Sequence, residues 1–319
     1  MEKSAAVFDI FRGTTHDGPG LRTTVFFAGC PLHCAWCHNP EGIALGRKVW
    51  WDKRTCIGCM LCHAACKTGA NIAGEDGFVI DDSLCLRCGA CVRACPAQAM
   101  TFTSRTIALD ALVDEVMRDK AFYDKTGGGV TASGGECMLQ PAFLKGFFSE
   151  LSERGVDTAI DTCGMVPYES FEKVLPYTCH VLYDFKILDS AMHQKHTGQS
   201  NDVILENARR IARGIAQGQL TCDLWIRTPL IPDATATPEN IAAIGSFLAR
   251  ELYGAVSRWE LCAFNNSCAG KYERLGLAWA YRDKPLLSEA AAQALMDIAC
   301  SCGFPNDRIA LTGIIAQAR

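Results

Sequence analysis

The sequence predicts an α/β fold, a partial barrel of six parallel strands with helical crossovers that is interrupted by a small inserted domain. Two observations lead to this prediction. Short apolar segments alternate with amphipathic segments at helical spacing along most of the 319 residues, as strand–helix repeats do. Where this alternation stops, eight cysteines form two compact runs between residues 56 and 95. We therefore expect the barrel at 1–50 and 101–319, and the inserted domain at 51–100.

The six strands and their helices can be placed in order. The first strand, 22–28, is rich in β-branched and aromatic residues and leads into Gly29 and Cys30. Apolar residues recur at helical spacing from Ile107 and again from Pro141. In barrels of this kind, chemistry collects at the C-terminal ends of the strands. Further strands are expected at 130–133, 158–161, 181–186, 223–228 and 259–264, and further helices near 168–175, 201–217, 238–252 and 288–302.

Composition argues against several classes of protein. The net charge is −4 and the pI about 6.0, so no basic field suggests a nucleic-acid or membrane-surface partner. The N-terminus lacks the apolar region of a signal peptide, and no apolar stretch reaches the roughly 18 residues of a spanning helix. We expect a cytoplasmic protein. In that reducing compartment, 19 cysteines indicate metal binding or catalysis rather than disulfides.

Cys30, Cys34 and Cys37 supply three thiolates at C-x3-C-x2-C spacing. Four-iron clusters are normally held by four cysteines, so a cube held by three leaves one iron with an open position. An open position distinguishes a catalytic metal site from a closed structural one. The alternative is a zinc site with His33 or His38 as the fourth ligand.

The two cysteine runs of the insertion both read C-x2-C-x2-C-x3-C, the pattern of bacterial two-cluster ferredoxins. In that pattern the fourth cysteine of each run binds the other cluster. Zinc ribbons, the alternative, would show paired C-x2-C knuckles instead of triplets. The eight remaining cysteines are interpreted mainly as small buried residues, with Cys300 and Cys302 as the one pair suited to redox chemistry. The predicted ligand sets are Cys56, Cys59, Cys62 and Cys95 for one cube, and Cys85, Cys88, Cys91 and Cys66 for the other.

Polar and charged residues follow the predicted strands at their C-terminal ends. Gly134-Gly135-Glu136 follows the second strand, Asp161-Thr162 the third, and Asp184 and Lys186 end the fourth. Each is common alone, but a purely structural barrel has no need of acids and a lysine at successive strand ends. Their shared location predicts a site there.

These residues resemble the radical S-adenosylmethionine (radical SAM) superfamily and, within it, the activating enzymes of glycyl radical enzymes. The resemblance covers nearly the whole chain, including the two-cluster insertion of one subgroup. It rests on Cys30-x3-Cys34-x-Trp36-Cys37, on the leader Asp17-Gly18-Pro19-Gly20-Leu21-Arg22, on Ser133 to Glu136, on Asp161 to Gly164, and on Tyr183 to Lys186. Two departures stand out: Cys137 replaces a usual proline, and Asn265 stands where some relatives have a histidine.

The resemblance implies a role for each matched position. Cys30, Cys34 and Cys37 hold the catalytic cube, whose open iron is chelated by the methionine part of S-adenosylmethionine. The leader contacts the partner's glycine loop through Asp17, Gly18, Pro19, Gly20 and Arg22. A monovalent cation is expected at Asp161, Thr162 and Asp184. The cofactor-binding residues implied are Trp36 (toward adenine), His38, Gly134, Gly135, Glu136, Asp161, Asp184, Lys186 (toward the carboxylate), Arg227 and Asn265.

The expected function is therefore that of an oxidoreductase with three [4Fe-4S] clusters. It would cleave S-adenosylmethionine reductively to methionine and a 5′-deoxyadenosyl radical, which takes hydrogen from a glycine of a partner enzyme. A low-potential donor such as flavodoxin or ferredoxin would supply the electron, and we expect a monomer. The insertion either relays electrons or docks the partner. The alternatives are another radical SAM maturase or a non-enzymatic electron carrier. The insertion favours a dehydratase, lyase or decarboxylase partner over the pyruvate formate-lyase type.

Overall fold

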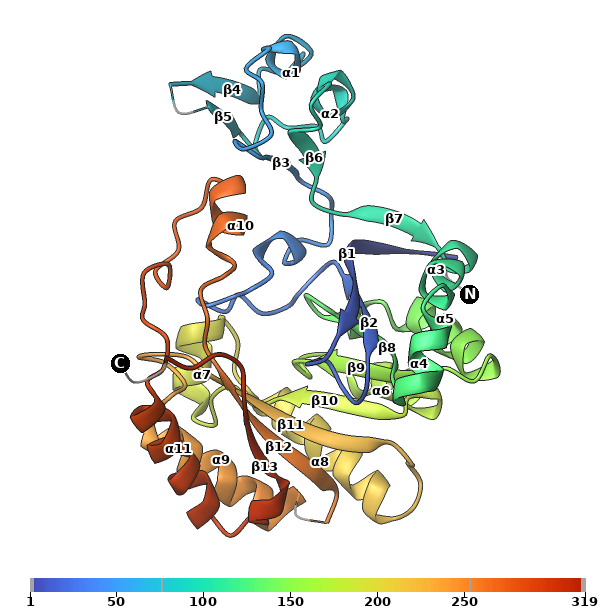
Figure 1. Cartoon of the computed structure of the whole chain (residues 1–319), viewed down its shortest axis with the longest axis vertical. Coiled ribbons are helices and arrows are strands. Elements are labelled where there is room, and N and C mark those ends of the chain that lie inside the picture. Colours follow the sequence, from blue (N-terminus) through green and yellow to red (C-terminus); the bar gives the residue numbers. More distant parts are fainter. Residues whose placement is uncertain (1–2, 76, 253, 317–319) are drawn as a thin grey trace.

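The computed structural model describes residues 3–75, 77–252 and 254–316. Its main feature is a nine-stranded sheet with the order β13-β12-β11-β10-β9-β8-β2-β1-β7, whose strands fan around a central space with helices along the outer face (Figure 1). Because β13 and β7 are its two edges, the sheet is not closed. The strands are β1 (Ser4–Thr14), β2 (Arg22–Phe27), β7 (Arg105–Ala108), β8 (Gly129–Gly134), β9 (Asp157–Thr162), β10 (His180–Asp184), β11 (Asp223–Leu230), β12 (Val256–Ala263) and β13 (Ile309–Thr312).

The six predicted strands are confirmed as β2 and β8 to β12, and all of them run parallel. The sequence reasoning missed three others. β13 extends the parallel part, whereas β1 and β7 pair antiparallel at the opposite edge. β7 and β13 have only four residues each, and the outer half of β1 is largely exposed. None of these three strands therefore shows a strong apolar pattern. Ile107, which was expected to begin a helix, belongs to β7, and the observed helix begins at Leu109.

The helices of the barrel form where an apolar face coincides with a start signal. In α8, for example, Ile204, Ala208 and Ile211 recur on the buried face. In α9, Pro238 stands in the first turn after Thr237, whose side chain accepts a hydrogen bond from the Asn240 amide. The helices are α3 (Leu109–Met117), α4 (Lys120–Thr126), α5 (Pro141–Glu153), α6 (Tyr168–Val174), α7 (Ser190–Thr197), α8 (Asp202–Ala216), α9 (Pro238–Phe247), α10 (Ala269–Arg274) and α11 (Glu289–Ser301).

One large apolar core lies between the sheet and these outer helices. Phe27 of β2 packs edge-on against Phe143 of α5, and Phe147 stacks on Phe143 one turn further along. Burying such side chains contributes about 2–3 kcal/mol each and fixes the helices to the strands. The strand ends that carry the polar residues are thereby held rigidly. Among the described residues, no helix is both long enough and apolar enough to cross a membrane.

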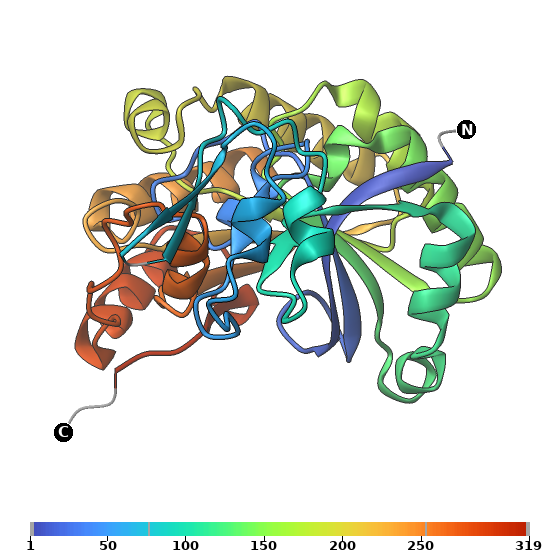
Figure 2. The same cartoon turned by 90° about the horizontal axis from the view of Figure 1, so that it is seen from above.

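A small separate unit stands on the barrel (Figures 1 and 2). β3 (Val49–Trp51) pairs with β6 (Met100–Phe102) at its base, and β4 (Asn71–Gly74) forms a hairpin with β5 (Gly77–Ile80). Two short helices, α1 (Leu61–Ala64) and α2 (Ala90–Ala94), pack against each other. The unit has its own apolar core around Val49, Cys62 and Met100, and it runs slightly beyond the predicted limits of 51–100.

Candidate active site

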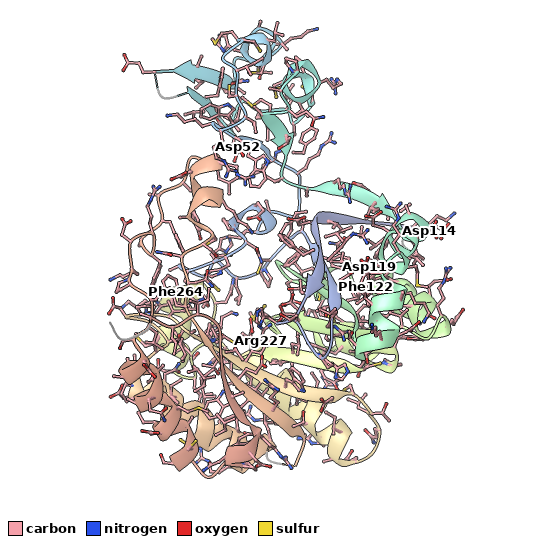
Figure 3. The ribbon with its side chains drawn as sticks, viewed as in Figure 1. Asp52, Asp114, Asp119, Phe122, Arg227 and Phe264 are labelled. Atoms are coloured by element: carbon pink, nitrogen blue, oxygen red, sulfur yellow. The ribbon has the colours of Figure 1, made fainter. Side chains whose placement is uncertain are left out.

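A cavity of about 390 Å³ opens at the C-terminal ends of the parallel strands. Figure 3 shows Arg227 on the inner side of the sheet and Phe264 nearer the three-cysteine loop. The cavity brings together residues from seven parallel strands, β2 and β8 to β13, or from the loops that follow them. Of the predicted site residues, those that line it are Cys30, Cys34, Trp36, Cys37, His38, Gly134, Gly135, Asp161, Thr162, Asp184, Lys186, Arg227 and Asn265.

The three-cysteine loop is held by main-chain hydrogen bonds on both sides. The amide of Cys30 donates to Ile43 O at 2.9 Å, and the amide of His33 donates to Thr197 O at 2.7 Å. Gly29 has a φ of +100°, a conformation that favours glycine, where the chain turns from β2 into the loop. Burial raises the pKa of the Cys34 thiol to about 11, which is the expected cost of thiols placed to bind metal as thiolates.

An aromatic segment after β12 covers this loop. Tyr272 of α10 donates its hydroxyl to Cys37 O at 2.8 Å, and the indole of Trp279 donates to Ala35 O at 3.2 Å. The two rings stack with centroids 4.9 Å apart. Trp36 belongs to the same cluster and meets Tyr281 edge-on. We call residues 266–284 the strap, because their side chains donate hydrogen bonds to carbonyls of the loop.

The turn after β8 is built for close approach of main chains. A Cβ on Gly134 would lie 2.3 Å from the Phe27 amide nitrogen, and one on Gly135 would lie 2.3 Å from Gly29 O. These glycines are therefore required by packing against the end of β2, whether or not a ligand approaches them.

Glu136 does not line the cavity, although the sequence leads us to expect it in cofactor binding. Its buried carboxylate accepts hydrogen bonds from the amides of Met138 at 3.0 Å and Cys163 at 2.8 Å, and from the Thr162 hydroxyl. Burial raises its pKa, while these hydrogen bonds oppose the shift. The carboxylate ties the turn after β8 to the turn after β9, so it positions both turns.

The charged residues of the cavity are paired with one another. Lys186 forms an ion pair with Asp184, and Arg227 Nη1 lies 3.2 Å from Asp161 Oδ1. Burial raises the pKa of Asp161 to about 6, although Arg227 opposes this shift. Burial disfavours the charged form of Lys186, but Asp184 raises its pKa above the ordinary value, so the lysine is a cation.

The structure does not test the predicted monovalent-cation site at Asp161, Thr162 and Asp184, which stays a prediction. Asp161 and Asp184 are already matched by Arg227 and Lys186, and the Thr162 hydroxyl donates to Glu136.

His38 and Asn265 also line the cavity. Burial lowers the pKa of His38, so its ring is neutral at neutral pH. Asn265 Oδ1 accepts a hydrogen bond from the Ser267 amide at 3.1 Å, which leaves its amide group to face the cavity.

The leader 17–22 lies at the other end of the sheet, where Arg22 pairs with Gly129 at the start of β8. Its chain turns inward, so that Asp17 O accepts a hydrogen bond from Thr131 and the Asp17 carboxylate accepts one from Thr24. Asp17 and Pro19 are half-buried, Gly18 is buried and Gly20 is exposed. Asp17, Pro19 and Gly20 therefore remain accessible for a partner.

Arg22 contradicts its predicted role as a partner contact. Its side chain is 0% exposed, forms an ion pair with Asp157 at 2.8 Å and donates to Thr131 and Val130. It joins the N-terminal ends of three strands. A guanidinium with this many donors can satisfy several strand ends at once, which explains arginine at this position.

Several lining residues were missed by the sequence reasoning. Cys163, interpreted as a small buried residue, lies beside Cys30, and the hydrogen bond between the two thiols lowers the pKa of Cys30. Cys262 and Thr312 line the cavity on the side of β12 and β13. His16, which directly precedes the leader, lines the cavity as well. Cys163 follows Asp161-Thr162 directly, so the strand-end argument would have found it. Thr312 carried no signal, because β13 was not predicted.

Four of the eight cysteines of the small unit lie together. One small cavity is lined by Cys56, Cys59, Cys62 and Cys95 together with Trp51. In the other group, Cys66 and Cys85 lie near enough to Cys91 to contribute to the rise in its pKa, after burial. Across the described residues, no three Cys, His, Asp or Glu side chains are placed to hold a single metal ion. A four-iron cube spaces its ligands differently, because each binds a separate iron.

Comparison with known proteins identifies the family. The Radical SAM superfamily model matches residues 24–236. The indoleacetate decarboxylase activating enzyme of Tractidigestivibacter scatoligenes is 36% identical over 304 residues, which are 92% of this chain and 94% of that relative. The 4-hydroxyphenylacetate decarboxylase activating enzyme of Clostridioides difficile is 35% identical over 298 residues, 92% of each chain. The (2S)-3-sulfopropanediol dehydratase activating enzyme of Klebsiella oxytoca is 34% identical over 278 residues, 86% of each.

Among solved structures, a radical SAM methyltransferase from Sphaerobacter thermophilus shares the fold. Its TM-score is 0.53 at 13% identity, covering 97% of this chain and 73% of that one. This likeness concerns the fold alone. The chain belongs to the radical SAM superfamily and, within it, to the activating enzymes of glycyl radical enzymes.

Proposed function

We propose that this protein activates a partner glycyl radical enzyme by abstracting a hydrogen atom from one glycine of that partner. The cavity that joins Cys30, Cys34 and Cys37 to Lys186 carries the proposal, because it combines three thiols with a fixed cation. The three thiols fit a cube with one open iron. The bound cube and S-adenosylmethionine would supply reductive cleavage and the 5′-deoxyadenosyl radical.

The residues of the chain bind and orient the cofactor. Lys186 supports the carboxylate of its methionine part, and Trp36 offers an apolar surface to the adenine. Gly134 and Gly135 present main-chain groups to the amino group of that methionine part. Glu136 holds this turn in place. The strap keeps water from the three-cysteine loop, which protects a radical from side reactions. The predicted monovalent cation would bind at Asp161, Thr162 and Asp184, beside the ion pairs of Arg227 and Lys186.

The first test is cofactor cleavage. The anaerobic protein, reduced with dithionite, should convert S-adenosylmethionine to 5′-deoxyadenosine and methionine, and Cys34→Ala should not. Lys186→Met should raise the Kd for S-adenosylmethionine about tenfold or more, because one buried charge-assisted contact is worth about 1.5–3 kcal/mol. Absence of 5′-deoxyadenosine from the iron-loaded protein would contradict the proposal.

The partner belongs to the group of small-molecule lyases, dehydratases and decarboxylases. Support comes from the relatives, whose names refer to indoleacetate decarboxylase, 4-hydroxyphenylacetate decarboxylase and sulfopropanediol dehydratase. Only the glycine loop of the partner would enter the cavity. The residues that line the cavity therefore do not indicate which small molecule the partner acts on.

We further propose that the small unit holds two additional [4Fe-4S] clusters, on the ligand sets predicted above. The cavity shared by Cys56, Cys59, Cys62 and Cys95 supports the first set, and the proximity of Cys66 and Cys85 to Cys91 supports the second. The reconstituted protein should hold about twelve irons per chain, four per cube. Cys59→Ser and Cys88→Ser should each disturb one cube only, as followed by Mössbauer spectroscopy.

A non-enzymatic electron carrier is the second candidate function, since the proposed clusters of the small unit would be sufficient for electron transfer. It leaves the barrel cavity without a role. It predicts a protein that takes up electrons but yields no 5′-deoxyadenosine.

A further inference from the structure

Charge is distributed unevenly within the small unit. The two segments that carry the ferredoxin-type cysteines, 53–74 and 83–105, hold six of the chain's 31 basic residues and none of its 35 acidic residues. The basic residues are Lys53, Arg54, Lys67, Arg87, Arg93 and Arg105. The acidic residues of the small unit, Asp52, Glu75, Asp76, Asp81 and Asp82, lie outside these segments, so the unit as a whole is neutral and its positive charge is confined to the cysteine-bearing segments.

These charges lie at the surface beside the cysteine loops. Lys67 and Arg87 are exposed, and no carboxylate of the described residues forms an ion pair with either. Cys59 and Cys88 are exposed as well, so an edge of each cube would lie close to solvent. Ile57 and Leu86 add large apolar surfaces, 67% and 75% exposed. We call this surface, formed by 53–67 and 85–93 with α1 and α2 side by side, the cysteine-loop face (Figures 1 and 2).

The small unit also adjoins the three-cysteine loop. A second cavity, of about 440 Å³, is lined by Cys30 and His33 on the barrel side and by Trp51 and Phe78 on the other. Trp51 and Phe78 also line the small cavity of Cys56, Cys59, Cys62 and Cys95. Their rings meet edge-on at 5.6 Å. Two aromatic side chains thus separate the nearer predicted cube from the space that reaches Cys30.

The strap joins the two parts on the same side. Arg274 lies 3.6 Å from Asp52 and packs over the ring of Trp50, with its guanidinium carbon 4.4 Å from the ring centre. The same segment anchors the three-cysteine loop through Tyr272. Figure 3 places Asp52 at this junction. The orientation of the small unit over the loop is therefore fixed by side-chain contacts.

We propose that the cysteine-loop face is the docking surface for an acidic one-electron carrier protein, and that electrons enter the enzyme there. This inference rests on the proposed function. The carrier's anionic surface complements Lys67 and Arg87, its reduced cofactor comes near the exposed cysteine edges, and Ile57 and Leu86 supply apolar contact. The carrier would give up one electron, becoming oxidised, to a cube held by the cysteines of the small unit. Trp51 and Phe78 stand between those cysteines and the cavity that reaches Cys30.

Charge favours a carrier here over the partner glycyl radical enzyme. The partner's glycine must reach the barrel cavity, which the small unit does not line. A carrier has to approach the cubes, and both exposed cysteines lie on this face. Some of the positive charge also balances cluster thiolates. Salt dependence separates these two roles, because only docking to a charged partner responds strongly to ionic strength.

The test is stopped-flow reduction of the iron-loaded enzyme by reduced flavodoxin, a small acidic carrier, at increasing ionic strength. Docking at the cationic face predicts that salt slows reduction. Docking at the anionic body predicts the opposite, because salt would screen repulsion. Lys67→Glu/Arg87→Glu should lower the second-order rate constant at low salt about tenfold or more. The matched control, Lys173→Glu/Arg213→Glu on α6 and α8, should change it little.

Dithionite separates this inference from the proposed function. The Lys67→Glu/Arg87→Glu variant should keep its iron content and should still bleach and form 5′-deoxyadenosine when dithionite is the reductant. An unchanged flavodoxin rate would overturn the inference, and so would a rate that rises with salt in the unaltered enzyme. If the variant instead lost affinity for the glycyl radical enzyme alone, the face would be a partner dock and the inference would be wrong. Failure of dithionite-reduced enzyme to cleave the cofactor would overturn the proposed function instead.

Discussion

At the scale of single residues, the structure separates groups that bind from groups that position. Lys186 and Arg227 point their charge into the cavity, whereas Glu136 and Arg22 are buried among protein partners. Sequence pattern located all four but could not distinguish these roles. A motif shows that a residue type is needed at a position. Only the neighbours, such as Thr162 and Cys163 around Glu136, show whether the need lies in ligand binding or in packing.

Arg22→Ala should destabilise the fold rather than weaken partner binding. It would leave the Asp157 carboxylate, about 29% exposed, without its main cation, at a cost of about 3 kcal/mol in the free energy of unfolding. Anaerobic urea unfolding measures this. Arg12→Ala is the control, because its ion pairs with Glu115 and Asp119 are more exposed and should cost less than about 1 kcal/mol. Unchanged stability together with weakened partner binding would restore Arg22 as a contact residue.

His180 should make stability depend on pH. Burial alone lowers its pKa, but hydrogen bonds with Asp157 at 3.0 Å and with Asp223 raise the pKa to about 9; Arg22, nearby, opposes this. The folded state thus holds a proton that the unfolded chain loses at about 6.5. The stabilisation is complete below pH 6.5 and is lost as pH rises through 9. It amounts to about 3 kcal/mol at most.

The His180 contribution can be isolated by substitution. His180→Gln should be less stable than the unaltered protein at pH 6 and nearly equal to it above pH 9, as followed by urea unfolding at each pH. A constant difference across this range would show that the imidazole does not titrate as described.

At the scale of elements, the long and periodic segments were predictable and the contacts between distant ones were not. The six parallel strands follow from apolar runs bounded by helices, because each is buried on both faces. β7 and β13 were not predicted, since they are short edge strands with little apolar character, and β1 was missed because its outer half is exposed. The strap was not predicted from the sequence either. Its purpose depends on meeting Cys37 O and Ala35 O across the fold, which no local pattern encodes.

Lys271 of the strap should be needed to hold the three-cysteine loop. Its ammonium lies 2.6 Å from the buried carboxylate of Glu41 and donates to Asn39 at 2.8 Å, just after Cys37. Lys271→Met leaves Glu41 buried without its cation and should cost about 3 kcal/mol in unfolding free energy. The iron of the catalytic cube should also be lost faster to a chelator.

A double-variant cycle tests the cause. Lys271→Met/Glu41→Gln removes the uncompensated charge and should recover a large part of the stability. Strictly additive losses would show that the two side chains act independently and that the ion pair does not fix the loop.

At the scale of the whole molecule, an open sheet carries one cavity at its strand ends and a small unit with a cationic cysteine-loop face beside it. The sequence already indicated the division between barrel and insertion, because cysteine spacing and apolar periodicity change together. It did not indicate that Trp51 and Phe78 stand between the two predicted metal regions, nor that Arg227 balances Asp161. Both depend on how the strands and the small unit meet in space.

The central claim is that the cavity generates a radical that ends on a glycine of a partner protein. The most direct measurement is anaerobic electron paramagnetic resonance of the reduced enzyme mixed with S-adenosylmethionine and a glycyl radical enzyme of the decarboxylase, lyase or dehydratase group. The account predicts a glycine-centred doublet that collapses to a singlet when the partner's glycines are deuterated at Cα, and no signal with Cys34→Ala. Cofactor cleavage without any glycine-centred signal, across partners of this group, would contradict it.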